Sequence, residues 1–322
     1  MKPIFQKNRF IFSGVLLIFL SFLVFSCKSI PDSEFSGEIA TGEENWKSVP
    51  LYPPAENILW KEIRPGIREF SYSVSRKTPE KDTHSKNGKL HYRVIEVDFE
   101  ALSDAGVKPE FFVKKPSGTK YWDTSESVKR FAKHTGSFIA TNTNPFHIRQ
   151  HYNPLSQGHI LGICIENGKI YSEPDKNYCG IAFYKKENTA TNQSLWRAQI
   201  FDRQTEILKS NEDGDAEAVP ECACGGFWTI LDKGEIREFH KIWDTRNAVA
   251  TKNDGKTVLF LAGEALTFME TAEIFKALGA QKAMQFDGGN STALYAEGKL
   301  KFSPFIHVNV LAILGIKLTG KN

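Results

Sequence analysis

Apolar and polar positions divide the chain into a leader, a polar spacer and a long patterned region. Three basic residues within the first nine positions precede a mostly apolar run, residues 10–25, which ends at Ser26-Cys27. This layout is typical of an export signal, and the run is shorter than the roughly 20 residues of a membrane-spanning helix. We predict that Cys27 becomes the lipidated N-terminus of a bacterial envelope protein, on the periplasmic side or the outer surface. A plain secretory signal or an uncleaved anchor is the alternative.

The spacer follows the leader and has little apolar periodicity. Ser, Glu, Gly and Pro are frequent in it, and such a segment buries too little apolar surface to offset its ordering entropy. We therefore predict a signal peptide over residues 1–27, a flexible tether over 28–60 and one folded domain over 61–322. Hydrophobic residues make up 41% of the chain, enough for one large core, and β-rich single domains reach this length.

Short apolar stretches alternate with turn dipeptides through the predicted domain. Asn-Gly, Asp-Gly and related pairs supply the positive φ angles of tight hairpins. The pattern predicts an α+β fold with a mixed, largely antiparallel β-sheet core and a few packed helices. The turn dipeptides are Asn87-Gly88, Asn167-Gly168, Lys233-Gly234, Asp254-Gly255 and Glu297-Gly298.

Two segments have the spacing of helices. The first begins at Thr124 or Ser125 and ends near Gly136, so that a hydroxyl residue starts it and a glycine stops it. The second runs from Thr267 to Leu278, with apolar residues on one face and a glycine directly after it. We expect the apolar face of the second helix to be buried.

Each predicted helix is followed by a β-type run that ends in a polar loop. Residues 137–141 lead to the loop 142–146, and residues 282–286 lead to the loop 287–291. Loops at such strand ends often carry binding chemistry. The two glycines after Asp287 let the backbone approach a ligand, and their amides can accept a phosphate. A carboxylate beside such a cradle suits acid or base catalysis, although Asp-Gly-Gly alone is also an ordinary turn.

The order of these segments resembles the phosphodiester glycosidase family. A helix ending in Leu278-Gly279-Ala280 leads through a strand to Asp287-Gly288-Gly289 and Ser291, as in the family signature. Residues 246–250 resemble the Arg-Thr-Ala-Ile-Gly strand of the family, and residues 142–146 resemble its Asn-Gly-Gly-Phe-Phe loop. The likeness extends over about residues 90–314. It implies the family fold and cleavage of a sugar-1-phosphodiester bond in an envelope or extracellular glycoconjugate, with no cofactor and no metal.

The chain departs from the family pattern at several positions. Asn290 replaces the third glycine, Asn247 replaces threonine, and Thr143-Asn144 replace paired glycines. Asparagine tolerates the left-handed conformation better than most residues. We expect Asn144 and Asn290 to keep the backbone path of the glycines that they replace.

The resemblance also implies a site, in which Asp287 and Arg246 are catalytic. Arg246 offers a planar fork of donors that matches a phosphate, with a structural ion pair as the alternative. Glycoside cleavage usually takes two carboxylates, and Glu264 and Glu173 are weak candidates for the second. The expected ligand is a carbohydrate or sugar phosphate. The predicted substrate-binding residues are Asn142, Asn144, Gly288, Gly289, Asn290 and Ser291.

Other chemistry-bearing residues leave alternatives open. Four cysteines permit two disulfides after export, although structural or free thiols are favoured over a metal or redox site. Three histidines flank the 142–146 loop, where nearby prolines favour solvent-facing or substrate-contacting roles over zinc binding. Three aromatic residues could stack on sugars or pack in the core. In order, these groups are Cys164, Cys179, Cys222 and Cys224; His147, His151 and His159; and Tyr152, Phe227 and Trp228.

Charge excludes one class of partner and leaves two further functions open. The formal net charge of +3 gives no nucleic-acid footprint. A non-catalytic glycan-binding or surface interaction lipoprotein on the same fold is the main alternative. A metal-dependent phosphodiesterase is a weaker one. The expected partners are the sugar substrate and, through the lipid anchor, the membrane.

Overall fold

The computed structural model describes residues 49–78, 88–116, 123–148, 157–188, 193–209 and 219–320. The predicted signal peptide and most of the predicted tether lie outside these ranges. The described residues belong to one compact unit. None of the helices in the described ranges combines the length and the apolar character needed to span a bilayer.

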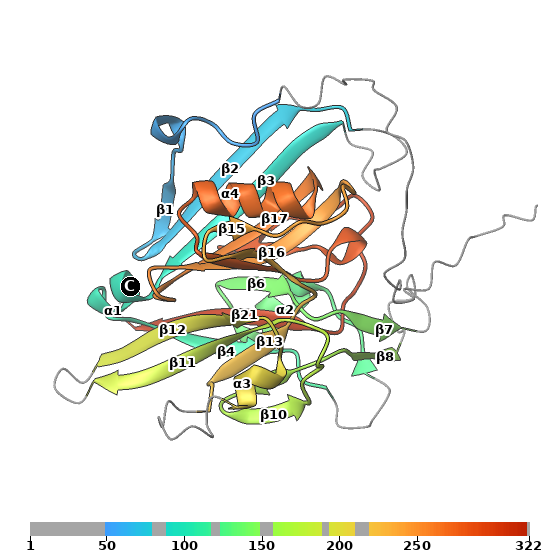
Figure 1. Ribbon diagram of the computed structural model, residues 1–322. Helices are drawn as coiled ribbons and strands as arrows, with labels where there is room; N and C mark the ends of the chain where they lie inside the picture. The colour runs from blue at the N-terminus through green and yellow to red at the C-terminus, as the bar shows by residue number, and fades with distance from the viewer. Residues whose placement is uncertain are drawn as a thin grey trace, which may run out of the picture. The chain divides into compact units, whose positions relative to one another are not determined.

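The described strands form antiparallel sheets, which confirms the predicted largely antiparallel core (Figure 1). The largest sheet has eight strands in the order β1-β2-β3-β17-β16-β18-β14-β15, so the middle of the sheet combines segments far apart in sequence. The strands in that order are β1 (Lys61–Arg64), β2 (Ile67–Ser75), β3 (Lys89–Asp98), β17 (Thr257–Leu266), β16 (Asp244–Lys252), β18 (Lys282–Gln285), β14 (Thr229–Asp232) and β15 (Glu235–Ile236).

Three smaller sheets complete the described part. One has the order β10-β9-β13-β11-β12, one has the order β20-β19-β6-β21-β4, and the smallest has the order β5-β8-β7. Their strands are β10 (Lys169–Ser172), β9 (Cys164–Glu166), β13 (Cys222–Gly225), β11 (Gly180–Asn188), β12 (Gln193–Phe201), β20 (Lys299–Phe302), β19 (Leu294–Ala296), β6 (Ile139–Asn142), β21 (Ile313–Gly320), β4 (Val107–Val113), β5 (Asp123–Thr124), β8 (Gln157–Ile160) and β7 (Phe146–Ile148).

Turn dipeptides close the hairpins as their residue types predict. In four of the five pairs both residues have positive φ, for example 50° at Asn167 and 72° at Gly168. The Asp254-Gly255 turn joins β16 to β17, and the Glu297-Gly298 turn joins β19 to β20. Asn87 of the fifth pair lies outside the described residues. Local turn chemistry therefore determines these connections.

The second of the two predicted helices is confirmed. Helix α4 (Phe268–Ala277) begins with a capping box, in which the Thr267 side chain accepts from the Glu270 backbone and the Glu270 side chain accepts from the Thr267 backbone. Gly279 follows the helix with φ +83°. Its apolar residues pack on the large sheet, against which Figure 1 shows the helix lying.

The predicted start of the first helix is wrong. Helix α2 (Val128–Thr135) begins after Ser127, whose side chain caps it, and ends at a left-handed Gly136. Glu126 is still extended because its backbone exchanges two hydrogen bonds with Val310. Two further short helices, α1 (Phe99–Asp104) and α3 (Thr205–Lys209), were not predicted, since five or six residues carry too little periodicity.

The middle of the large sheet is buried on both faces. On β16, Val249 joins the core shared with the smaller sheets, whereas Ala248 and Ala250 join the core under α4. This alternation follows from the two-residue period of a strand. Leu51, Tyr52, Ile58 and Trp60, which fall within the predicted tether, also pack against the core under α4.

Candidate active site

The Asp287 loop begins where β18 ends and is held by its neighbours. The Asp287 backbone N–H donates to the Thr143 carbonyl at 2.8 Å. A Cβ on Gly288 would lie 2.9 Å from the Thr245 carbonyl oxygen, and Gly289 has φ +57°. A larger residue would clash at the first position and be strained at the second. The two glycines thus let the loop fold closely against β16.

The carboxyl group of Asp287 is poised between its two protonation states at neutral pH. The pKa of Asp287 is raised from 3.8 to about 7, mainly by burial and also by the charge of Asp244, while hydrogen bonds from the Ser291 side chain and the Gly288 backbone oppose the rise. A carboxyl group with such a pKa can donate or accept a proton under physiological conditions.

A second carboxylate, Asp244, stands beside the loop. Its Oδ2 lies 3.9 Å from the position of a Cβ on Gly289, and its charge acts on both Asp287 and Arg246. Neither sequence candidate occupies this position, because Glu264 pairs across the sheet with His91 and Glu173 is exposed beyond β10. The sequence analysis missed Asp244, whose only local signal is an acid two residues before the family arginine.

Asn142 ties the two loops together. Its side-chain amide donates to the Asp287 carbonyl at 2.7 Å, and its Oδ1 accepts from the Asn247 side chain and the Ala293 backbone, each at 2.9 Å. Asn247 also donates to the Asn142 carbonyl at 2.7 Å and accepts from Thr141 at 3.0 Å. Asn247, which replaces the family threonine, therefore forms part of the hydrogen-bond framework under Asp287.

The remaining predicted binding residues have different surroundings. The Asn144 side chain donates to the carbonyls of Leu161 and Ile163 and accepts from Gly225 N–H, each at 3.0 Å, and it accepts from Thr143 as well. All its hydrogen-bonding capacity is thus used within the protein. Asn290 is exposed, which leaves it open to a ligand.

Asn144 and Asn290 do not use the left-handed conformation that asparagine tolerates. Neither is among the described residues with positive φ. Asn290 lies in a 3₁₀ turn (Gly289–Ser291), in which Gly289 alone has a positive φ. The missing third glycine is therefore no obstacle to the loop.

Arg246 lies on the other side of the sheet from Asn247. Its guanidinium stacks on the Phe268 ring at 3.9 Å, and its Nε donates to the Leu266 carbonyl at 3.0 Å. The Nη2 atom donates to the Ile242 carbonyl, and the residue is only 6% exposed. Burial lowers the pKa of Arg246 to about 10, so it stays charged at neutral pH.

An aromatic group borders the strand that leads to Asp287. Phe227 N–H donates to the Gln285 carbonyl at 2.7 Å, and Phe227 stacks on Trp228 at 5.1 Å between ring centroids. Trp228 also contacts Phe268 and is 42% exposed. Tyr152, the third predicted aromatic residue, lies outside the described ranges.

The cysteines and histidines are placed as follows. Cys164, Cys179, Cys222 and Cys224 are buried free thiols, and burial raises the pKa of Cys164 to about 12. The His147 and His159 rings pair across β7 and β8 at 5.2 Å, and His151 lies outside the described part. Within the described ranges, no three His, Cys, Asp or Glu side chains form a group that could hold a metal ion.

One further histidine was missed by the sequence analysis. The ring of His307 is hydrogen-bonded to the backbone of Asn290, and burial lowers its pKa. Its buried Nδ1 has no hydrogen-bond partner among the described residues. His307 therefore lies at the Asp287 loop, where burial disfavours its charged form.

Comparison with known proteins places this geometry in a family. Residues 135–314 match the model of the phosphodiester glycosidase family. The catalytic domain of zebrafish N-acetylglucosamine-1-phosphodiester alpha-N-acetylglucosaminidase, auto-inhibited by its pro-peptide, is similar with a TM-score of 0.53 and 17% identity over 80% of this chain and 85% of that one. The sequence matches none of the curated proteins.

Two further solved structures are similar. A Burkholderia pseudomallei protein has a TM-score of 0.53 and 12% identity over 73% of this chain and 75% of that one. A hypothetical protein from Synechocystis has a TM-score of 0.50 and 15% identity over 78% of this chain, which spans less than two thirds (62%) of that protein. At these identities the likeness concerns the fold alone.

Proposed function

Because the chain belongs to the phosphodiester glycosidase family, a family of hydrolases, we propose that it is a lipid-anchored hydrolase that cleaves a sugar-1-phosphodiester bond in an envelope or extracellular glycoconjugate. The observation that carries the proposal is the Asp287 carboxyl group, with a pKa of about 7, on the signature loop and beside the second carboxylate Asp244. A pair of carboxyl groups is the usual equipment of glycoside hydrolysis.

In the proposed reaction, Asp287 acts as the acid. Its protonated form donates to the phosphate oxygen as the bond from that oxygen to the anomeric carbon breaks. Asp244 accepts a proton from the water whose oxygen bonds to the anomeric carbon. The products are a free sugar and a phosphomonoester, and proton transfer of this kind typically contributes about 10²–10⁴-fold to the rate.

Substrate binding is assigned to the loop and the aromatic group. The backbone of Gly288 and Gly289 meets the phosphate, and the exposed ring of Trp228 stacks on the sugar. Asn142 acts as a positioning residue, since its amide holds the Asp287 carbonyl. Arg246 is also a positioning residue, because two of its nitrogens donate hydrogen bonds to backbone carbonyl groups.

A panel of sugar-1-phosphodiesters tests the reaction. We expect the purified chain to release free sugar and phosphomonoester from at least one member, and Asp287→Asn to lower the turnover by about 10²–10⁴-fold. Asp254→Asn, in a surface turn where asparagine keeps the positive φ, is the matched control. Equal turnover by Asp287→Asn would remove Asp287 from the mechanism. Tight binding without product would favour a glycan-binding protein, and loss of activity with a chelator would favour a metal-dependent phosphodiesterase.

The lipid anchor is tested separately. We expect cells that express the full chain to incorporate labelled palmitate into it, and Cys27→Ala to abolish the label. The same substitution releases the protein from the membrane fraction if the signal is still cleaved. A palmitate label that persists in Cys27→Ala contradicts this anchor and leaves the hydrolase proposal unaffected.

A further inference from the structure

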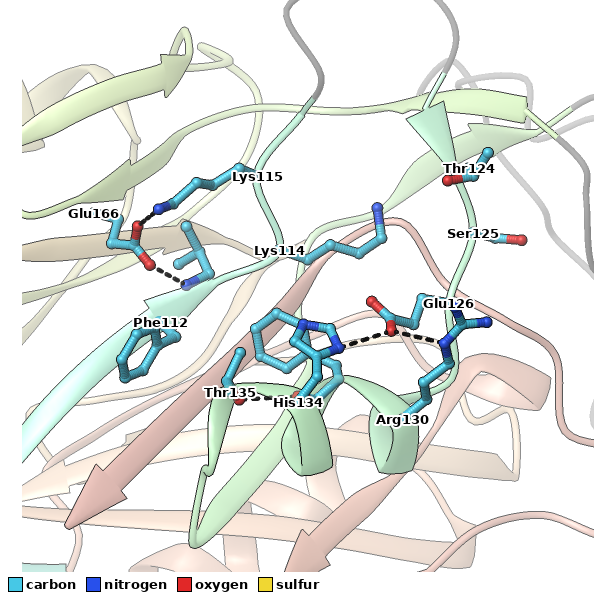
Figure 2. Close-up of a pocket in the computed structure, with 12 residues that line it drawn as sticks. Phe112, Lys114, Lys115, Thr124, Ser125, Glu126, Arg130, His134, Thr135 and Glu166 are labelled. Atoms are coloured by element: carbon cyan, nitrogen blue, oxygen red, sulfur yellow. Dashed lines mark hydrogen bonds and ion pairs between the residues drawn. The ribbon is translucent and has the colours of Figure 1, made fainter.

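A cavity of about 610 Å³ lies apart from the Asp287 loop. Its walls come from the end of β4, the extended segment around Glu126 and helix α2 (Figure 2). The volume falls within the range of small-molecule sites. None of its lining residues belongs to the site described above.

The carboxylates that line this cavity are already paired. Glu166 forms an ion pair with Lys115 and accepts from the Val113 backbone at 3.2 Å. At the other wall, Glu126 lies 3.2 Å from His134 Nδ1 and 3.5 Å from Arg130 Nε. Figure 2 shows these two groups on opposite sides of the cavity. Each acid is therefore engaged by a cation of its own wall.

Lys114 lies between these two groups and differs from them. Its backbone N–H is fixed to the Ile313 carbonyl at 2.8 Å, and its side chain extends into the space between the walls (Figure 2). The ammonium group has no hydrogen bond or ion pair with any described residue, although the charges of Asp123 and Glu126 act on it. A half-buried ammonium without acceptors favours an anionic ligand, because the ligand replaces lost hydration.

The rest of the lining suits a hydroxylated ligand. Thr124, Ser125 and Thr135 contribute hydroxyl groups, and Phe112 contributes a half-buried ring. Aromatic faces and hydroxyl groups are the common contacts of sugar rings. We propose that the cavity is a second binding site that takes a sugar carrying one anionic group, a phosphate or a carboxylate, with Lys114 as its main contact.

The backbone gives this site a short connection to the Asp287 loop. The Val308 N–H donates to the Asn290 carbonyl at 3.1 Å, and Val310 exchanges two hydrogen bonds of 2.9 Å with Glu126 in the cavity wall. Two residues of extended chain span only about 7 Å. The second site does not depend on the proposed function, since binding there requires no turnover.

Calorimetric titration of the full mature chain tests the second site. The probes are glucose 6-phosphate, glucuronate and, as the uncharged reference, glucose. We expect both anions to bind at one site and glucose not to bind measurably. Preference between the two anions identifies the natural charged group. Absence of saturable binding by either anion overturns the proposal.

Variants locate the bound ligand. We expect Lys114→Gln to weaken anion binding by at least about tenfold, which corresponds to about 1.4 kcal/mol. Lys114→Arg should stay within about threefold of the wild type because it keeps the charge. Lys133→Gln removes an exposed α2 lysine outside the lining and should change nothing. Undiminished binding by Lys114→Gln overturns the proposal.

Two more variants make these results independent of folding and of catalysis. Arg130→Gln, at an 82% exposed side chain of the lining, should also weaken binding and provides a second test if Lys114→Gln melts at a lower temperature. Asp287→Asn should bind the anions unchanged. Loss of binding in Asp287→Asn alone would place the ligand at the Asp287 loop and contradict the second site.

Discussion

The 246–250 motif lies on strand β16, and its first two residues lie on opposite faces of that strand. Asn247 lies on the face that meets Asn142 and the Asp287 loop, whereas its neighbour Arg246 lies on the face beneath α4, stacked on Phe268. A strand sends successive side chains to opposite faces. Adjacent motif residues therefore serve two structures, a polar framework under Asp287 and an anchor for the start of α4.

Burial shifts the pKa values of Asp287 and Arg246 in opposite directions. It raises the pKa of Asp287 to about 7 and lowers the pKa of Arg246 to about 10. In both cases the low-polarity surroundings disfavour the charged form. At neutral pH the carboxyl group is thereby able to exchange a proton, while the guanidinium remains a fixed charge. Asp244 acts on both groups and connects the two faces electrostatically.

Replacement of Asp244 should have the largest effect. We expect Asp244→Asn to lower the turnover by about 10²–10⁴-fold, because the proposed base is lost. The residual activity should also decline at a lower pH than in the wild type, since removing the Asp244 charge lowers the pKa of the Asp287 acid. Steady-state kinetics across pH measures both effects. Full activity with an unchanged profile would exclude Asp244 from the site.

Loss of the Asn142 side chain, at the centre of the hydrogen bonds under Asp287, should lower the stability of the fold strongly. We expect Asn142→Ala to reduce the free energy of unfolding by about 3 kcal/mol, because the Asn247 amide and the Ala293 N–H lose their buried acceptor. Urea denaturation measures the change. Asn177→Ala, at an exposed loop asparagine, is the control and should stay within about 0.5 kcal/mol of the wild type. An equal loss of unfolding free energy in both variants would contradict a stabilising role of the Asn142 hydrogen bonds.

The pH dependence of stability reports the Asp287 carboxyl group directly. The pKa of Asp287 in the fold, about 7, lies above its ordinary value of 3.8, so the folded state binds a proton more tightly than the unfolded state does. The wild type should therefore lose stability as pH rises from about 4 to about 7, and Asp287→Asn should lack this loss. Melting temperatures of both proteins across that range check the sign. Parallel curves would mean that the pKa of Asp287 is not raised by the fold.

Substitution of Arg246, on the face of β16 beneath α4, should have the smallest effect. We expect Arg246→Lys to cost about 1–2 kcal/mol, because lysine loses the ring stacking and the two-carbonyl contact, while KM stays within about twofold. Phe268→Leu removes the same stacking, so the double variant should be less destabilised than the sum of the single ones. A tenfold rise in KM at unchanged stability would instead make Arg246 a phosphate ligand.

Local patterns predicted the hairpins and α4 well, because turn residues and capping boxes act within a few positions of themselves. The start of α2 was wrong because a distant strand residue, Val310, holds Glu126 extended. Of the site, Asp287, its two glycines and Ser291 come from a single short segment and could be recognised together. Asp244 and His307 could not, since only folding brings them to that loop.

The amino-acid sequence by itself determined the turns, the long helix and the family of the domain, because each depends on neighbouring residues or on an ordered set of motifs. The tertiary structure decided which side chains meet. Pairing of β16 with β18 turns Asn247 toward Asn142 and Arg246 away from it, and it surrounds Asp287 with enough protein to raise its pKa. Burial and strand pairing are properties of segments far apart in the chain, so no local pattern contains them.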